Sequence, residues 1–431
     1  MRGITLMWTR APRLAVAMAV AAMAAPVLFA RAEQQAPPQA QKPPVFRSSV
    51  DLVRVDVSVV DNKGMPVLGL GVDDFKVFLD GRERRVVTAE MVTFDPPSTG
   101  GTSSTDPIRT PGQVPEDARV FVLAIDQMGL APGAISPVKD SVRRFLTQLR
   151  PEDMVGLYDF PFRSGPLDIS HDRSTVIRGL DRVIGMRSSA NGSSFTLSAS
   201  EIVDIAANDL IAFERAFSRE CVPAGGIAAD PVEADACRTN LRMEARMLAL
   251  AYENEASQRM NELAKLAQSL QFIPGRKTVV MVSNGLVSSN RPGGRPDLQS
   301  VMRIVGDDLA NAQANLYVLH LDQTFMEVYS AAAPMSRRPA DRFESMSADR
   351  FVATAGLEIL AGRSGGTIFS VDAGTPDHVF DRLLRETAAY YVIGVEPADE
   401  DRDGKEHYIR VETTARGSTL RSRVQVLVPR R

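Results

Sequence analysis

Short apolar runs with few charges alternate with segments of helical periodicity between residues 118 and 395. A run such as Val120–Ile125 is typical of a strand buried on both faces, because neither face presents a polar residue to water. Six segments have this or a similar pattern: Val120–Ile125, Met154–Tyr158, Lys277–Val282, Leu316–Leu321, Thr367–Val371 and Tyr390–Val395. The helical segments between them predict an α/β fold with a doubly wound, mostly parallel, Rossmann-like sheet that helices cover on both faces.

The first 32 residues have the order of features that marks a cleavable secretory signal peptide. Arginines precede the uncharged run Leu14–Phe29, and a small-residue motif ends at Ala32, near which we expect cleavage. An uncleaved membrane anchor is the alternative, but a run of about 16 residues is shorter than the roughly 20 that span a bilayer. We therefore expect export, to the periplasm or out of the cell, without a stable membrane anchor. Residues 33–45, rich in Gln, Pro and Ala, predict a disordered spacer.

A long helical hairpin is predicted between residues 198 and 272, inside the α/β region. One helix is expected from about residue 200 to 218 and a second from about 240 to 270. Apolar residues recur at three- and four-residue steps along the second helix, which predicts a core-filling face: Met243, Met247, Leu250, Leu263, Leu266 and Leu270. Cys221 and Cys237 lie in the joining loop, and an even pair in an exported protein predicts a disulfide bond.

Strand patterns of period two lie at both ends of the folded part of the chain. Residues 46–95 contain three such patterns separated by turns, and residues 396–431 contain two more. Each group is too small to build a core by itself. Since chain termini often lie close together, we expect the two groups to form one small β-sandwich. Residues 96–117, rich in Pro, Gly and Ser, predict a linker between the first group and the α/β region.

Polar residues follow three of the predicted parallel strands. Asp126 and Gln127 come after the first strand, Asn284 after the third and Asp322 after the fourth. In open α/β sheets, ligands bind at the carboxyl ends of the strands, where the winding reverses. We therefore predict a binding surface that includes these four side chains.

Four features of this chain occur together in a known family. They are the strand-borne Asp126, the segments Gly-Arg-Lys at 275–277 and Ser-Asn-Gly at 283–285, the strand at 390–394, and β segments at both ends. In this combination the chain resembles the von Willebrand factor A (VWA) domain family, and in particular the exported VWA-related proteins of acidobacteria. The resemblance covers nearly the whole chain after the expected signal peptide.

The resemblance implies a metal-ion-dependent adhesion site for Mg²⁺, built from Asp-x-Ser-x-Ser after the first strand, a Thr and a second Asp. Asp126 matches the first Asp, Thr196 or the serine two residues before it would supply the Thr, and Asn284 stands where the second Asp is expected. Met128 and Leu130 replace the two serines, and neither side chain has an oxygen for Mg²⁺. The motif is therefore degenerate, and we expect Mg²⁺ to bind weakly or not at all.

The sequence contains no recognisable catalytic set, which favours a non-enzymatic, protein-binding or adhesion-type module. The alternatives are an envelope structural or assembly protein with a vestigial site, and a hydrolase that uses carboxylates. A hydrolase needs two acidic groups at close range, which the sequence does not place together. The candidate carboxylates are Asp153, Asp159, Asp168, Asp172 and Asp322. A net charge of −3 and the lack of a basic block argue against nucleic acid as a partner.

Overall fold

The computed structural model describes residues 52–94, 118–161, 167–187, 193–222, 230–291, 293–323, 339–371 and 375–430, with the backbone only for residues 339–344. All of these residues belong to one unit, Val50–Arg431. The predicted signal peptide, spacer and linker lie outside the described residues and stay predictions. Within the described ranges, no helix combines the length and the apolar character that crossing a membrane requires.

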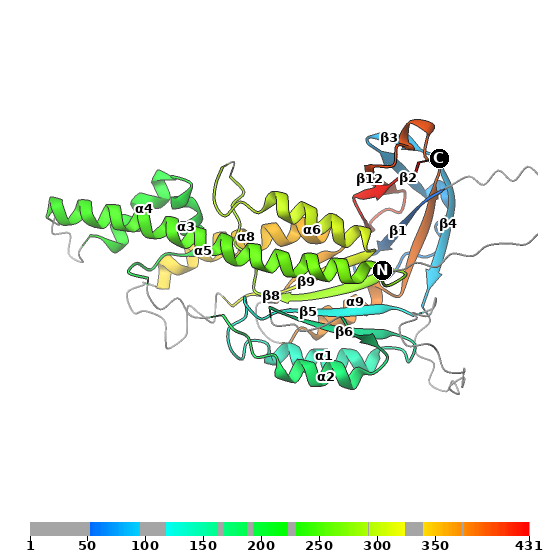
Figure 1. Cartoon of the computed structure of the whole chain (residues 1–431), viewed down its shortest axis with the longest axis horizontal. Coiled ribbons are helices and arrows are strands. Elements are labelled where there is room, and N and C mark those ends of the chain that lie inside the picture. The colour runs from blue at the N-terminus through cyan, green and yellow to red at the C-terminus, as the bar shows by residue number, and fades with distance from the viewer. Residues whose placement is uncertain are drawn as a thin grey trace, which may run out of the picture. The chain divides into compact units, whose positions relative to one another are not determined.

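A six-stranded sheet lies at the centre of the described structure (Figure 1). Its order is β10-β9-β8-β5-β6-β7, and every neighbouring pair is parallel except β6 and β7. Its strands are β5 (Val120–Asp126), β6 (Met154–Phe160), β7 (Ile169–Ser170), β8 (Lys277–Ser283), β9 (Ala314–Leu321) and β10 (Thr367–Val371). All residues of β5, β8 and β9 are buried. The predicted α/β fold with a mostly parallel sheet is therefore confirmed, and the arrangement is consistent with a Rossmann-like fold.

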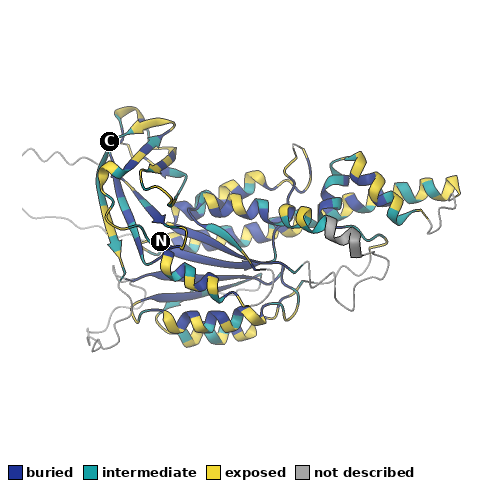
Figure 2. Cartoon of the chain, turned by 180° about the vertical axis from the view of Figure 1, so that it is seen from behind, coloured by how far each residue is buried: buried dark blue, intermediate teal, exposed yellow. Residues whose placement is uncertain are grey.

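Helices cover both faces of this sheet, and Figure 2 shows their buried sides turned toward it. The helices α1 (Ser136–Gln148), α2 (Arg173–Arg182) and α9 (Asp377–Glu386) share one hydrophobic cluster with the sheet. The helices α5 (Pro231–Gln271), α6 (Gln299–Asn311) and α8 (Pro339–Arg363) share a second cluster on the opposite face. The strands are mostly apolar because both of their faces are covered, and their few polar residues, such as Lys277 and His320, lie near strand ends.

The helical insertion differs from the predicted hairpin in two respects. The second predicted helix begins earlier than about residue 240, because α5 starts at Pro231, so Cys237 lies in its first turns and not in the joining loop. The first predicted helix is two helices, α3 (Ala199–Ala206) and α4 (Leu210–Glu220). Asn208 has a φ of 63°, which ends α3, and the side chain of Asp209 then caps α4 by accepting from two backbone amides. The structure contains the predicted disulfide between Cys221 and Cys237, which joins the end of α4 to α5.

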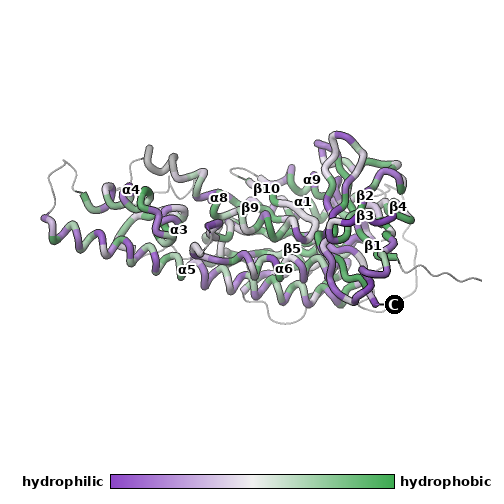
Figure 3. The backbone as a smooth tube through the Cα atoms, turned by 90° about the horizontal axis from the view of Figure 1, so that it is seen from above, coloured by the Kyte–Doolittle hydropathy of each residue, from purple (hydrophilic) through white to green (hydrophobic). Residues whose placement is uncertain are grey.

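The apolar face predicted for the second helix is correct in only one half of α5. Leu263, Leu266 and Leu270 are fully buried against the sheet. The other three predicted core residues are exposed on the insertion: Met243, Met247 and Leu250. There a different set of α5 side chains is buried, and they pack with α3 and α4 in a separate cluster that includes Leu241 and Ala245. Figure 3 shows hydrophilic and hydrophobic residues mixed along α5, so its hydropathy does not reveal where the core-facing side changes.

Strands from the two ends of the described chain pair in two four-stranded sheets. The orders are β13-β1-β11-β4 and β14-β12-β2-β3. The strands are β1 (Val53–Val60), β2 (Phe75–Leu79), β3 (Arg82–Arg84), β4 (Val86–Thr93), β11 (Ala389–Val395), β12 (Glu406–Thr413), β13 (Thr419–Ser422) and β14 (Gln425–Leu427), with short 3₁₀ turns η1 (Val72–Asp74) and η2 (Asp399–Asp401). Buried residues of both sheets form one hydrophobic cluster.

One strand pairs differently from its prediction. The segment at 390–395 was expected to complete the parallel sheet, but β11 pairs antiparallel with β1 and β4. Tyr391 explains part of this placement, because its hydroxyl donates to Val67 O and accepts from Leu70 N, both in the N-terminal β segment. Such long-range contacts are not visible in the local pattern of the strand.

The two ends of the six-stranded sheet have different neighbours. At the amino ends of the strands, Arg276 donates to Ser58 of β1 and its guanidinium lies 4.7 Å from the ring centre of Tyr390 in β11. At the opposite end, Arg291 pairs with Asp204 of α3, in the insertion. Figure 1 shows α3 and α4 beyond one end of the sheet and β1, β2 and β4 beyond the other. The candidate site therefore lies at the edge that the insertion adjoins.

Candidate functional site

Asp126 and Asn284 meet where the winding of the sheet reverses. Asp126 ends β5 and Asn284 follows β8, and these neighbouring strands run parallel. Asp126 Oδ2 accepts a hydrogen bond of 2.7 Å from the hydroxyl of Ser283. A Cβ atom on Gly129 would lie 2.2 Å from Asn284 Oδ1 and 2.8 Å from Asp126 Oδ2, so both oxygens crowd the same glycine. The structure thus brings these two predicted site residues together, and it leaves no space for a side chain at position 129.

The Asp126 carboxylate is fully buried, and a buried arginine lies beside it. Its Oδ1 accepts from Gly129 N at 3.1 Å. Arg259 of α5 places Nη1 3.6 Å from Oδ2, and this arginine is only 5% exposed. The same Nη1 donates to the backbone oxygen of Gly285 at 2.9 Å, which aims the guanidinium at the end of β8. The site therefore contains a buried pair of opposite charges.

Two polar atoms of the site have no hydrogen-bond partner among the described residues. They are Asn284 Oδ1 and Arg259 Nε, and both atoms are buried. Buried polar atoms are rarely left unpaired, because each one loses its bonds to water without replacement. The backbone oxygen of Asn284 is engaged, at 3.0 Å from His320 Nε2, so the loop itself is anchored. The atoms at this edge that lack hydrogen-bond partners therefore belong to side chains and not to the backbone.

The other predicted site residues make internal contacts. Gln127 donates to Asp159 at 3.4 Å and accepts from the amide of Ile184 at 3.3 Å. Asp322 is 9% exposed and pairs with Arg350 at 2.6 Å. These bonds connect the ends of the strands to neighbouring loops and to α8.

Thr196 lies in the segment that leads into the insertion. Its backbone amide donates to the carboxylate of Glu220, and its carbonyl accepts from Arg219 of α4. The neighbouring Phe195 and Leu197 pack against the cluster formed by α4 and the first half of α5. These contacts anchor Thr196 to the insertion.

The residues at the carboxyl edge do not fit a magnesium site. Mg²⁺ requires a near-octahedral shell of oxygen atoms at about 2.1 Å. Leu130 is fully buried in the hydrophobic core, and Met128 also lacks a side-chain oxygen. Both oxygens of Asp126 accept hydrogen bonds, and Arg259 adds a positive charge. Across the described part of the chain, no group of three or more His, Cys, Asp or Glu residues is placed to hold a metal ion.

Two of the carboxylates considered for a hydrolase have structural roles. Asp172 caps α2, and hydrogen bonds from Ser174 and Thr175 lower its pKa to about 2. Asp153 is fully buried at the amino end of β6 between Arg119 and Arg150. Burial raises the pKa of Asp153, but the hydrogen bonds and charges of the two arginines outweigh this effect and hold the pKa below its ordinary value. A general acid needs a raised pKa, which neither group has.

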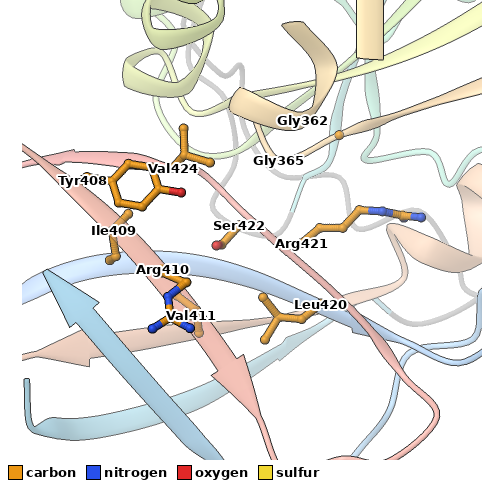
Figure 4. Close-up of a pocket in the computed structure, with 11 residues that line it drawn as sticks. Gly362, Gly365, Tyr408, Ile409, Arg410, Val411, Leu420, Arg421, Ser422 and Val424 are labelled. Atoms are coloured by element: carbon orange, nitrogen blue, oxygen red, sulfur yellow. The ribbon is translucent and has the colours of Figure 1, made fainter. Parts of the chain in front are cut away.

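A cavity of about 260 Å³ lies away from this edge, between the end of α8 and the strands β12 and β13 (Figure 4). Its wall combines three glycines with apolar side chains and two arginines. Arg421 is bound to Glu386, and Arg410 stacks on Phe78 with 4.2 Å to the ring centre. Both charged groups of the wall therefore already have partners, and the other polar side chains of the lining are the hydroxyl groups of Tyr408 and Ser422.

Arg259 is the residue of the candidate site that was not predicted from the sequence. It interrupts an apolar face of α5 that includes Ala256, Met260 and Leu263, so a charged residue at this position was a usable signal. Buried arginines are rare unless they are paired. Its partner, Asp126, lies far away in sequence, and no local pattern links the two.

Comparison with known proteins gives no family for this chain: no protein-family model matches it, and no curated protein matches it significantly. The functional conclusion therefore rests on the geometry of the carboxyl edge and on the sequence.

Proposed function

We propose that the protein is an exported, non-enzymatic binding module of the VWA type, with a degenerate metal site and a small β-sandwich made from its terminal strands. The mostly parallel sheet, with polar residues where its winding reverses, supports the VWA-like assignment. The shared cluster of the two four-stranded sheets supports the sandwich. The N-terminal sequence supports export.

The observation that carries the proposal is the unpartnered Asn284 Oδ1 at the carboxyl edge. Asn284 is half-buried as a residue, but its Oδ1 is itself buried in the free chain, so a partner reaches this oxygen only when the side chain turns toward the surface. A donor N–H or O–H from a bound protein satisfies this oxygen, and the loss of an unpaired buried acceptor favours the complex. The partner is therefore a protein that presents a hydrogen-bond donor to this edge.

A second candidate is a structural or assembly protein of the cell envelope with a vestigial site. The complete burial of Asp126 and the internal contacts of Gln127 and Asp322 favour it. In this case the carboxyl edge only stabilises the fold and the insertion above it. Both candidates share the expected export and the absence of catalysis.

An interaction experiment with two matched variants separates the candidates. Purified chain, crosslinked in an envelope extract of the source cells, is compared with Asn284→Glu and with Asn62→Glu, which changes an exposed turn after β1. A partner captured by wild type and Asn62→Glu but lost with Asn284→Glu supports the binding module. A partner retained by all three forms contradicts binding at this edge. The mass of the exported chain checks the expected start at Glu33.

A further inference from the structure

Arg259 brings a positive charge into a site that otherwise consists of oxygen atoms. Asp126 Oδ2, Ser283 Oγ and Asn284 Oδ1 come from the ends of β5 and β8, and Arg259 Nη1 lies 3.6 Å from Asp126 Oδ2. Because Arg259 is 5% exposed, salt and water screen its charge little. We propose that the Arg259 guanidinium is the built-in cation of this site, replacing a divalent ion and making the site metal-independent.

A divalent cation on Asp126 would lie close to this guanidinium. Mg²⁺ lies about 2.1 Å from its oxygen ligands, so an ion on Asp126 Oδ2 is within about 6 Å of Nη1. At this distance, in a buried site, the two positive charges repel each other strongly. Arg259 already provides the unit of positive charge that Asp126 can neutralise, and its Nη2 also lies 3.5 Å from the carboxylate of the exposed Glu255.

The position of the Arg259 guanidinium is fixed by a hydrogen bond and by the packing of its neighbours on α5. Nη1 donates to Gly285 O at 2.9 Å, and the neighbouring Ala256 and Met260 are buried in the core against the sheet. The side chain therefore cannot move aside for an ion without breaking this bond and moving an unpaired charge through the core. The fixed position of the Arg259 guanidinium and its positive charge together exclude a divalent ion from Asp126.

The test is a comparison of metal responses in the full mature chain. Wild-type protein is expected to keep its Tm within about 0.5 °C when about 10 mM MgCl₂ or MnCl₂ is added. Arg259→Met leaves the three oxygens without their cation, and its Tm is expected to rise by about 2 °C with Mn²⁺. The double variant Arg259→Met/Asp126→Asn is expected to lose this rise.

Two further variants serve as controls. One keeps the positive charge at position 259, and the other removes a positive charge at the opposite edge of the sheet. Arg259→Lys retains a positive charge and is expected to behave as wild type. Arg276→Met removes the arginine that bonds Ser58 and Asn315 at the amino edge, and it is expected to show no metal response. If Arg259→Met does not fold, Arg259→Gln replaces it in the same comparison, with calorimetric Mn²⁺ titration of wild type beside it.

Two results would overturn the proposal. One is an Mn²⁺ response of wild-type protein that disappears in Asp126→Asn. The other is the absence of a response in both Arg259→Met and Arg259→Gln, because the guanidinium is then not what keeps metal out. The measurements use no partner, so they can fail or succeed independently of the proposed binding function.

Discussion

Two aspartates, one at each end of the six-stranded sheet, are both fully buried and both face arginines, yet their surroundings differ. Asp153, at the amino end, accepts hydrogen bonds from the side chains and backbone amides of Arg119 and Arg150. Asp126, at the carboxyl end, has its arginine at 3.6 Å and accepts from Ser283 and Gly129 instead. The first is a saturated structural clamp. The second is an offset ion pair beside two buried polar atoms without hydrogen-bond partners.

The largest expected effect comes from breaking the saturated clamp. Asp153→Asn leaves two buried arginines without their carboxylate and is expected to lower the free energy of unfolding by about 3–5 kcal/mol. Because the pKa of Asp153 is lowered in the fold, this contribution is present above pH 4 and is lost as the pH falls through the folded pKa. Urea denaturation at pH 7 and at acid pH measures both effects. A loss under 1 kcal/mol at pH 7 would mean that the clamp is not structural.

Removing the disulfide tests whether the insertion at the carboxyl end of the sheet unfolds independently of the sheet. Replacing Cys221 and Cys237 by serine frees a loop of 16 residues and is expected to remove about 3 kcal/mol of local stability. Hydrogen exchange should increase in α4 and in the first half of α5, whereas β5 and β8 should keep their protection. Equal loss of protection in the insertion and the sheet would show that the two regions unfold as one unit.

Lys277 is buried at the amino end of β8, and the pH dependence of stability measures what its buried charge costs there. Burial lowers the pKa of Lys277 to about 8, while its ammonium donates to Ile273 O. The folded chain therefore releases this proton at a lower pH than the unfolded chain, and stability should rise by about 1–2 kcal/mol between pH 8 and pH 9.5. Lys277→Met should lose this rise in urea denaturation, and the exposed control Lys63→Met should keep it. A rise of the same size in Lys277→Met would contradict the assignment.

The smallest expected effect is the coupling between Asp126 and Arg259. A double-mutant cycle with Asp126→Asn and Arg259→Met is expected to give about 1 kcal/mol, because the two groups lie 3.6 Å apart and Asp126 has other donors. The same cycle with Asp153→Asn and Arg119→Met should give at least twice as much. Equal coupling energies at the two ends would remove the distinction between clamp and site.

The fold was predictable where one local property decides the structure. A run that is mostly apolar is typical of a strand buried on both faces, so the strands of the parallel sheet and their covering helices followed from the sequence. The meeting of Asp126 and Asn284 followed in the same way, because neighbouring parallel strands end at one edge.

The predictions were wrong or incomplete where contacts between residues far apart in the sequence determine the structure. The strand β11 is apolar like the parallel strands, so its local pattern predicts the same sheet. It lies in a different sheet, where the hydroxyl of Tyr391 bonds to the N-terminal segment. The exposure of Met243 and Met247 depends on which side of α5 the helix α4 covers. Arg259 was overlooked because its charge is explained only by a carboxylate in another part of the chain.

The helix α5 belongs to both the insertion and the sheet. It runs as one element of 41 residues from the disulfide-bonded tip of the insertion to the hydrophobic core of the sheet. At 1.5 Å per residue, Cys237 and Arg259 lie about 33 Å apart along its axis. One continuous helix therefore connects the disulfide-bonded tip of the insertion with the buried ion pair at the carboxyl edge of the sheet.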